Sequence, residues 1–281
     1  MSERKKIIGS GIIIGILGAL LVKLGNPANM GICVACFYRD IAGALKLHSA
    51  GVVQYIRPEI IGFILGAFIV ALVKGEFRSR GGSSPITRFI LGFFLMIGAL
   101  VFLGCPLRMI LRLGNGDLNA VVGLVGYIIG IIIGIRFIEK GFTLGRNYEQ
   151  KKAGGYFMPA FAVAILIFLL VKPSFIVFSE SGPGALHASV IISLVAGLVI
   201  GGIIQRTRLC TAGGIRDAIM IKDFHLLWGL IGIFAFALIG NIIFNPAGFK
   251  IGFEGQPIAH NDFIWNFLGM VLVGICAVLL G

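Results

Sequence analysis

Long apolar segments recur along almost the whole chain, and short polar segments with turn-forming residues separate them. A helix needs about 20 mostly apolar residues to cross the hydrocarbon core of a bilayer. Eight segments approach or exceed that length, so the pattern predicts an all-α polytopic membrane protein. The predicted spans are 7–24, 52–74, 87–104, 118–138, 157–177, 187–205, 226–244 and 263–281.

Two shorter apolar segments, 33–47 and 210–221, differ from the predicted spans. Each begins at a cysteine and contains an arginine followed by an aspartate. Charged side chains at membrane depth are costly unless protein or a cavity surrounds them. We therefore expect these two segments to be re-entrant half-helices.

Composition and charge agree with this class. Hydrophobic residues make up 58% of the 281 residues and charged residues only 13%, about half the usual share. The net charge of +12 comes from lysines and arginines in short segments between apolar runs, so it gives no indication of a nucleic-acid partner. Because the segments 74–88 and 136–152 are rich in these residues and 178–186 has none, the positive-inside rule predicts a cytoplasmic N-terminus in a bacterial inner membrane.

An internal repeat is the strongest motif in the sequence. A cysteine is followed by an arginine six positions later and an aspartate seven positions later in two places, 177 residues apart. The two copies are Cys33, Arg39, Asp40 and Cys210, Arg216, Asp217. We expect a first repeat at 1–178 with five spans and an incomplete second repeat at 179–281 with three. Because five is odd, the second copy would be inverted in the membrane.

A third cysteine, Cys105, precedes Pro106 in the sequence Gly-Cys-Pro-Leu-Arg. Proline is common at the first position of a helix, so Cys105 would cap a short helix at its positive end. Arg108 and Arg112 lie one helical turn apart and add positive charge on one face. This arrangement favours an anion near the thiol.

Asp40 and Asp217 fall on the same helix face as the cysteines that precede them, two turns deeper. An unpaired carboxylate beside an anion path would be repulsive. We therefore expect both to form internal ion pairs, with Arg39, Arg216 or Arg108 as partners.

Other motifs support chemistry less well. Cys36 forms a Cys-x-x-Cys motif with Cys33, but glycine replaces it in the second copy. Cys276 lies inside an apolar span, and the two Asn-Pro-Ala tripeptides at 26–28 and 245–247 are expected to be loop turns at helix ends. The four histidines lack metal-ligand spacing, and no phosphate-binding loop or catalytic triad pattern occurs. We expect no enzyme activity, metal or cofactor.

The cysteine, arginine and aspartate motifs together resemble the YeeE/YedE family of bacterial membrane proteins for sulfur-containing ions, over nearly the whole chain. The sequence is most similar to the YedE branch, which is associated with selenium, whereas the YeeE branch is associated with thiosulfate. The resemblance implies an hourglass-shaped protein in which single cysteines pass the substrate along. The relay positions would be Cys33, Cys105 and Cys210, with Cys36 in support.

The expected function is import of a small sulfur- or selenium-containing anion, which a soluble sulfurtransferase-like partner could receive. Two alternatives stay open: a membrane thiol-disulfide oxidoreductase that uses Cys33 and Cys36, and a channel for small neutral solutes. The family pattern also includes a second Gly-Cys-Pro-Leu-Arg block, whose cysteine the 177-residue offset places at position 282. We therefore expect a UGA selenocysteine codon at that position, an ordinary truncation or a frameshift, which the downstream nucleotide sequence would distinguish.

Overall fold

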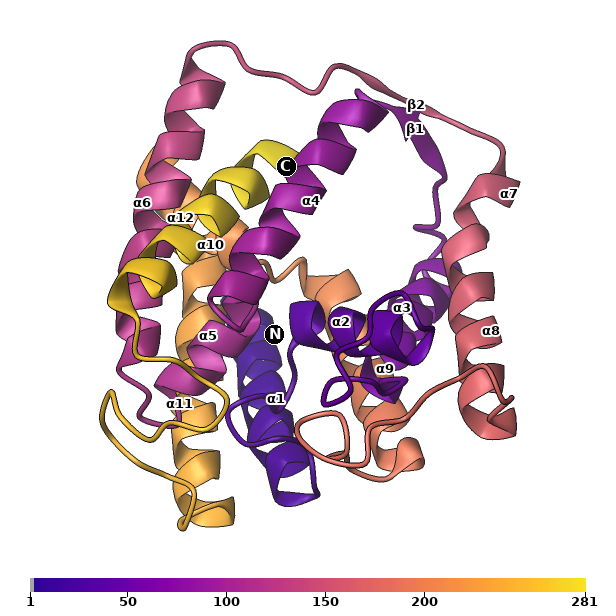
Figure 1. The fold of residues 1–281 in the computed structure, drawn as a ribbon. Coiled ribbons are helices and arrows are strands. Elements are labelled where there is room, and N and C mark those ends of the chain that lie inside the picture. The colour runs from indigo at the N-terminus through magenta and orange to yellow at the C-terminus, as the bar shows by residue number, and fades with distance from the viewer. Residues whose placement is uncertain (1–2) are drawn as a thin grey trace.

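The structure is a computed structural model that describes residues 3–281, and it is mostly helical, with long connecting loops (Figure 1). Eight long helices form its body. They are α1 (Glu3–Lys23), α3 (Pro58–Val73), α4 (Pro85–Val101), α6 (Asn119–Glu139), α8 (Phe157–Val171), α9 (Val190–Thr207), α11 (His225–Phe244) and α12 (Phe263–Leu280). The shorter elements are α2 (Val34–Ala44), α5 (Pro106–Leu113), α7 (Lys152–Gly155), α10 (Thr211–Met220), and the antiparallel strands β1 (Arg80–Gly82) and β2 (Asn147–Glu149).

Seven helical segments within residues 3–281 are long and apolar enough to cross a membrane. This confirms the prediction of an all-α multi-pass membrane protein. The remaining predicted span, 52–74, is shorter than expected, because α3 begins only at Pro58 and has 16 residues. Proline starts a helix readily since it has no N–H to satisfy, and the residues before it are held in an extended loop.

The predicted span 157–177 is also shorter in the structure. Its helix, α8, ends at Val171, and Lys172 adopts a left-handed conformation with a φ of 50°. Pro173 follows, and the residue before a proline is disfavoured in a helical conformation. The chain therefore leaves the helix there and continues as a loop.

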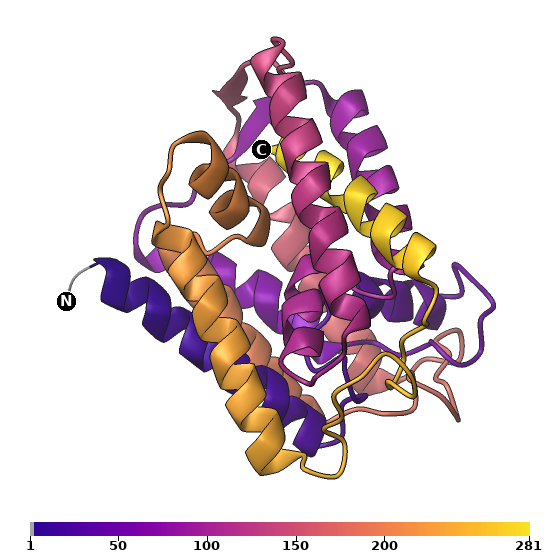
Figure 2. The same ribbon diagram turned by 90° about the vertical axis from the view of Figure 1, so that its left-hand side faces the viewer.

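Three helix pairs account for most of the packing: α1 with α11, α3 with α9, and α6 with α12, against which α4 also packs. Figure 2 shows α1 and α11 side by side. Glycines let the backbones meet in these pairs, as is common between membrane helices. A methyl group added at Gly11 would collide with the carbonyl oxygen of Gly229, and one at Gly197 would collide with that of Glu59.

The molecule has two ends with different character. At one end, here called the basic end, α1 and α11 begin and α3 and α9 finish. Arg4 stacks on Trp228 there, and Arg206 forms a 2.6 Å ion pair with Glu76. At the other end, called the loop end, long connections cover the helices. Asn245 donates to the Ala19 carbonyl at 3.0 Å and joins the ends of α11 and α1.

Two helical segments are interrupted part-way along their length. The segment Pro85–Leu113 breaks between α4 and α5, where Leu103 has a φ of 57°. The segment Val190–Met220 breaks between α9 and α10, where Arg208 has a φ of 56°. After each break a short helix begins at a cysteine, Cys105 or Cys210. The breaks therefore place helix N-termini inside the protein or at its edge.

Candidate functional site

Three cysteines, Cys33, Cys36 and Cys105, meet in the buried core and form what we call the thiol cluster. Cys33 caps α2, and its sulfur accepts a hydrogen bond from the Cys36 N–H at 3.4 Å. The Cys105 thiol stands at the start of α5 and is within electrostatic range of the Cys33 thiol. None of the three is more than 7% exposed. Cys33 and Cys105 each stand at the start of a short helix, as the sequence predicted.

Arg108 supplies the positive charge of the thiol cluster. Its side chain is fully buried, and one Nη donates to the Cys36 sulfur at 3.3 Å and to the Leu103 carbonyl. Its Nε donates to the Asn29 carbonyl at 2.7 Å, and the second Nη donates to the Ile258 carbonyl at 2.9 Å. No carboxylate within residues 3–281 pairs with it. The expectation that Arg108 could pair with an aspartate is therefore wrong, since carbonyls and a sulfur occupy its donors.

Asp40 is buried between two arginines. It pairs with Arg39 at 2.7 Å, as expected, and also with Arg57 at 2.8 Å. Arg57 donates further to the carbonyls of Leu186 and Pro183 and so joins α2 to the loop before α9. Sequence reasoning missed Arg57, because its contact with Asp40 depends on how a loop folds back and follows no helical spacing.

Arg112 stabilises the break between α4 and α5. It is buried, forms a 2.6 Å ion pair with Asp117, and donates to the Phe102 carbonyl at 3.0 Å. Its guanidinium also lies over the Phe102 ring. These contacts satisfy a carbonyl at the end of α4 and connect it to the loop after α5, so the orientation of Cys105 depends on them.

Cys210 lies outside the thiol cluster. It caps α10, and its sulfur accepts from the Gly213 N–H at 3.3 Å, the same local geometry as at Cys33. Unlike Cys33, it is exposed. Its repeat partners Arg216 and Asp217 form a 2.9 Å ion pair as expected, with about a quarter to a third of each side chain exposed.

Tyr127 of α6 lies between the thiol cluster and Cys210. It is fully buried, its hydroxyl is 3.3 Å from the Thr211 hydroxyl next to Cys210, and it is within electrostatic range of both Cys105 and Cys210. Sequence reasoning missed Tyr127, since one tyrosine in an apolar span carries no distinguishing signal.

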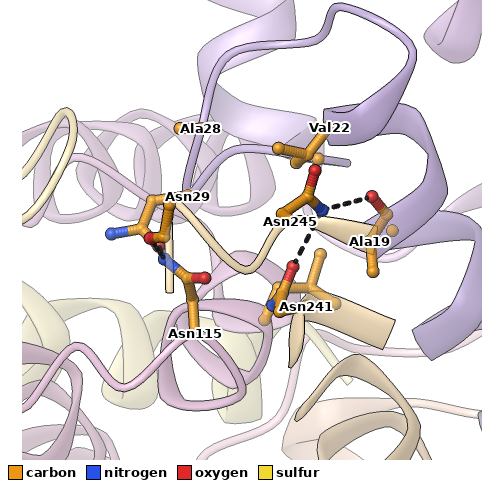
Figure 3. A pocket seen from close by; sticks show the side chains of 11 residues that line it. Ala19, Val22, Ala28, Asn29, Asn115, Asn241 and Asn245 are labelled. Atoms are coloured by element: carbon orange, nitrogen blue, oxygen red, sulfur yellow. Dashed lines mark hydrogen bonds between the residues drawn. The ribbon is translucent and has the colours of Figure 1, made fainter. Parts of the chain in front are cut away.

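The two Asn-Pro-Ala tripeptides lie at the ends of α1 and α11, as expected for loop turns. They contribute to a small pocket lined by asparagines (Figure 3), where Asn115 donates to the Asn29 side chain at 2.6 Å and Asn245 donates to Asn241 at 3.4 Å. The pocket has a volume of about 20 Å³, which is room for about one water molecule. These asparagines stabilise the loop end, and Asn29 also holds Arg108 in place.

The remaining candidates take no part in the thiol cluster. Cys276 is buried within α12, and His260 and His48 contact the carbonyls of Val101 and Arg39. Within residues 3–281, no three His, Cys, Asp or Glu side chains are placed to hold a metal ion. No protein-family model matches the chain, and no curated protein matches it.

Proposed function

We propose that the protein is a bacterial inner-membrane transporter that imports a small sulfur- or selenium-containing anion, such as thiosulfate, along a path of thiols. One observation carries this proposal: a buried arginine, Arg108, contacts the thiol cluster through the Cys36 sulfur and has no carboxylate partner within the described chain. A buried cation without an anion is costly, and a passing anion would lower that cost.

The choice of anion follows from the donors. The thiol cluster offers S–H groups, the N-termini of α2 and α5, and one guanidinium. A thiol is a weak hydrogen-bond donor and a polarizable one. A soft sulfur or selenium atom accepts such bonds, whereas a hard ion such as sulfate would lose more hydration than these donors replace.

The relay would pass from Cys33, with Cys36 in support, to Cys105 and then to Cys210. Tyr127 and Thr211, whose hydroxyls are 3.3 Å apart, would contribute polar groups to the last interval. Because Cys210 is exposed, a soluble sulfurtransferase-like protein could receive the cargo there. This order is the one that the resemblance to the YeeE/YedE family implies.

We further propose that the two halves of the chain form an inverted repeat, and the helix packing is compatible with it. In this repeat, α9 would correspond to α1 and α11 would correspond to α3. The pair α1–α11 would then correspond to the pair α9–α3, and both pairs are among the most closely packed in the molecule. Each pair is closed by glycines one turn apart, Gly11 and Gly15 in α1 and Gly197 and Gly201 in α9. On this interpretation α2 enters the membrane from the loop end and α10 from the basic end.

The orientation can be tested separately. Most lysines and arginines of the connections lie at the basic end, so we propose that this end faces the cytoplasm. A reporter fused near Gly145 should then be cytoplasmic, and one near Gly182 should be extracytoplasmic. Both reporters on one side would contradict the repeat, because α8 lies between the two positions.

The decisive experiment is uptake of ³⁵S-thiosulfate, and separately of ⁷⁵Se-selenite, into cells that lack their own uptake systems. Cys105→Ser and Cys210→Ser should each abolish uptake at normal membrane levels. Cys36→Ser should be milder than Cys33→Ser, and Cys276→Ser is the matched control because that thiol lies in α12. Full activity of Cys105→Ser would contradict the relay.

A thiol-disulfide oxidoreductase is the second candidate, because Cys33 and Cys36 are already in contact. It predicts that only these two cysteines matter and that the pair cycles between thiol and disulfide with a quinone or a thioredoxin-like protein. A trapped Cys33–Cys36 disulfide during turnover, with Cys105→Ser fully active, would favour it.

A further inference from the structure

A carboxyl group, Glu59, lies deep in the protein away from the thiol cluster. It stands in the first turn of α3 and is 1% exposed. Its Oε1 accepts two hydrogen bonds of 2.8 Å, from the amide of Asn26 and from the hydroxyl of Ser193. Its Oε2 has no hydrogen-bond partner among residues 3–281.

The charged groups around Glu59 do not neutralise it. Arg57, two residues earlier, pairs with Asp40 and with loop carbonyls. From the same loop, Tyr55 lies within electrostatic range of Glu59 and stacks on His187 with ring centroids 4.2 Å apart. The contacts from the α1–α2 connection and from α9 are neutral. Glu59 therefore has no ion-pair partner within the described chain.

These contacts suit a group that gains and loses a proton. Asn26 and Ser193 both donate to Oε1, and this oxygen can accept in the ionised and in the neutral acid. The free Oε2 is where the proton would sit. When Glu59 is ionised, the two donors and the N-terminus of α3 stabilise the charge.

Access comes from the loop end. Tyr55 and His187 line a pocket of about 350 Å³ there, together with Lys172 and Ser179. Asn26 also accepts the Ala188 N–H at 2.8 Å, so the residue after His187 is tied to the partner of Glu59. The pocket thus lies beside Tyr55, which is near Glu59, and beside His187, whose neighbour Ala188 is bonded to Asn26.

We propose that Glu59 binds a proton from the extracytoplasmic side and that this proton enters the cell together with the imported anion. The inference rests on the proposed function. An anion that moves inward works against the membrane potential, and a co-transported proton offsets one unit of its negative charge, which is half of the charge of thiosulfate. In the step, one O–H bond forms at Oε2 on the outer side and the same bond breaks when the proton leaves inward.

The test uses purified full-length protein in liposomes that contain a pH-sensitive dye. Thiosulfate added outside should acidify the interior of wild-type vesicles, and an inward proton gradient should raise thiosulfate accumulation at least about tenfold. Glu59→Gln keeps the side-chain shape but cannot take up a proton. This variant should exchange internal for external thiosulfate at close to the wild-type rate, yet show neither acidification nor gradient-driven accumulation.

The control is Glu180→Gln, since Glu180 is an exposed carboxylate on the loop between α8 and α9. It should behave as the wild type. If wild-type protein takes up thiosulfate and moves no proton, the inference is wrong and the proposed function stands. If wild-type protein takes up no thiosulfate or selenite, the proposed function is wrong. The inferred coupling of proton entry to anion import is then wrong as well. Gradient-driven accumulation retained in Glu59→Gln also overturns the inference, and the wild-type measurement alone decides if this variant does not fold.

Discussion

The two copies of the Cys-x5-Arg-Asp motif have the same local geometry and opposite surroundings. In each copy the cysteine caps a short helix and accepts an N–H from three residues later, at 3.4 Å for Cys33 and 3.3 Å for Cys210. In each copy the adjacent arginine and aspartate pair with each other. However, Cys33 and Asp40 are fully buried, whereas Cys210 is exposed.

The difference shows that a short motif determines the helix start but not the environment of its thiol. Around α2, Arg57 pairs with Asp40, and the Cys105 thiol lies near Cys33. Around α10, the neighbours are mainly apolar side chains of α6 and α11 that border an open groove. The first copy therefore encloses its thiol, whereas the second leaves its thiol accessible.

The largest expected difference between the copies concerns stability. Asp40→Asn should destabilise the protein by about 3–5 kcal/mol, because it leaves buried Arg57 without a counter-charge. Asp217→Asn should cost no more than about 1 kcal/mol, since its ion pair is partly exposed. Thermal unfolding of both variants in detergent measures this. Equal losses would show that the two copies have similar environments.

The next difference concerns the charge at each cysteine. Arg108→Gln should lower thiosulfate uptake by about 10- to 100-fold, which corresponds to losing a charge-assisted interaction of about 1.5–3 kcal/mol. Arg216→Gln should leave uptake nearly unchanged, because Arg216 pairs with Asp217. Uptake is normalised to the amount of folded protein in the membrane. A large loss in Arg216→Gln alone would reverse our assignment of the anion site.

Thiol accessibility should separate the copies directly. In variants that retain one cysteine each, a membrane-impermeant maleimide should label Cys210 about tenfold faster than Cys33, since reactivity requires access to the thiolate. Labelling of open membranes followed by mass spectrometry gives the rates. Equal rates before denaturation would contradict the burial of the thiol cluster.

The smallest expected effect concerns Tyr127, which lies between the two copies of the motif. Tyr127→Phe removes a hydroxyl that interacts with Thr211 at 3.3 Å, so uptake should fall by about two- to tenfold, equivalent to about 0.5–1.5 kcal/mol. Thr211→Val is the matched variant. If the two side chains act together, the double variant should be no worse than either single one, and fully additive losses would argue against a shared role.

Much of the fold could be predicted from hydropathy, because only helices satisfy their backbone groups within lipid. Apolar length predicted the positions of the long helices, and the Cys-Pro pair predicted the start of α5 at Pro106. The predicted and observed helix boundaries differ at Pro58 and Lys172. At each position, the backbone restriction imposed by a proline outweighs the tendency of the apolar segment to form a helix.

The candidate site was predictable only in part. Cys33, Cys105 and Arg108 follow from local spacing, because helix N-termini and helical faces are short-range properties. Arg57 and Glu59 do not, because their partners lie in loops or in helices far along the chain, such as Ser193. A sequence without aligned relatives gives no signal for such long-range contacts.

The glycine-closed helix pairs have a consequence for how cargo would cross the molecule. Where one backbone rests directly on another, as Gly98 does on Gly269 and Gly130 on Val271, sliding or rocking of the helices would force the chains into each other. Such a framework is rigid on the scale of whole helices. If the protein transports an anion as proposed, motion within these helix pairs would be limited to small rotations of side chains such as Arg108 and Tyr127.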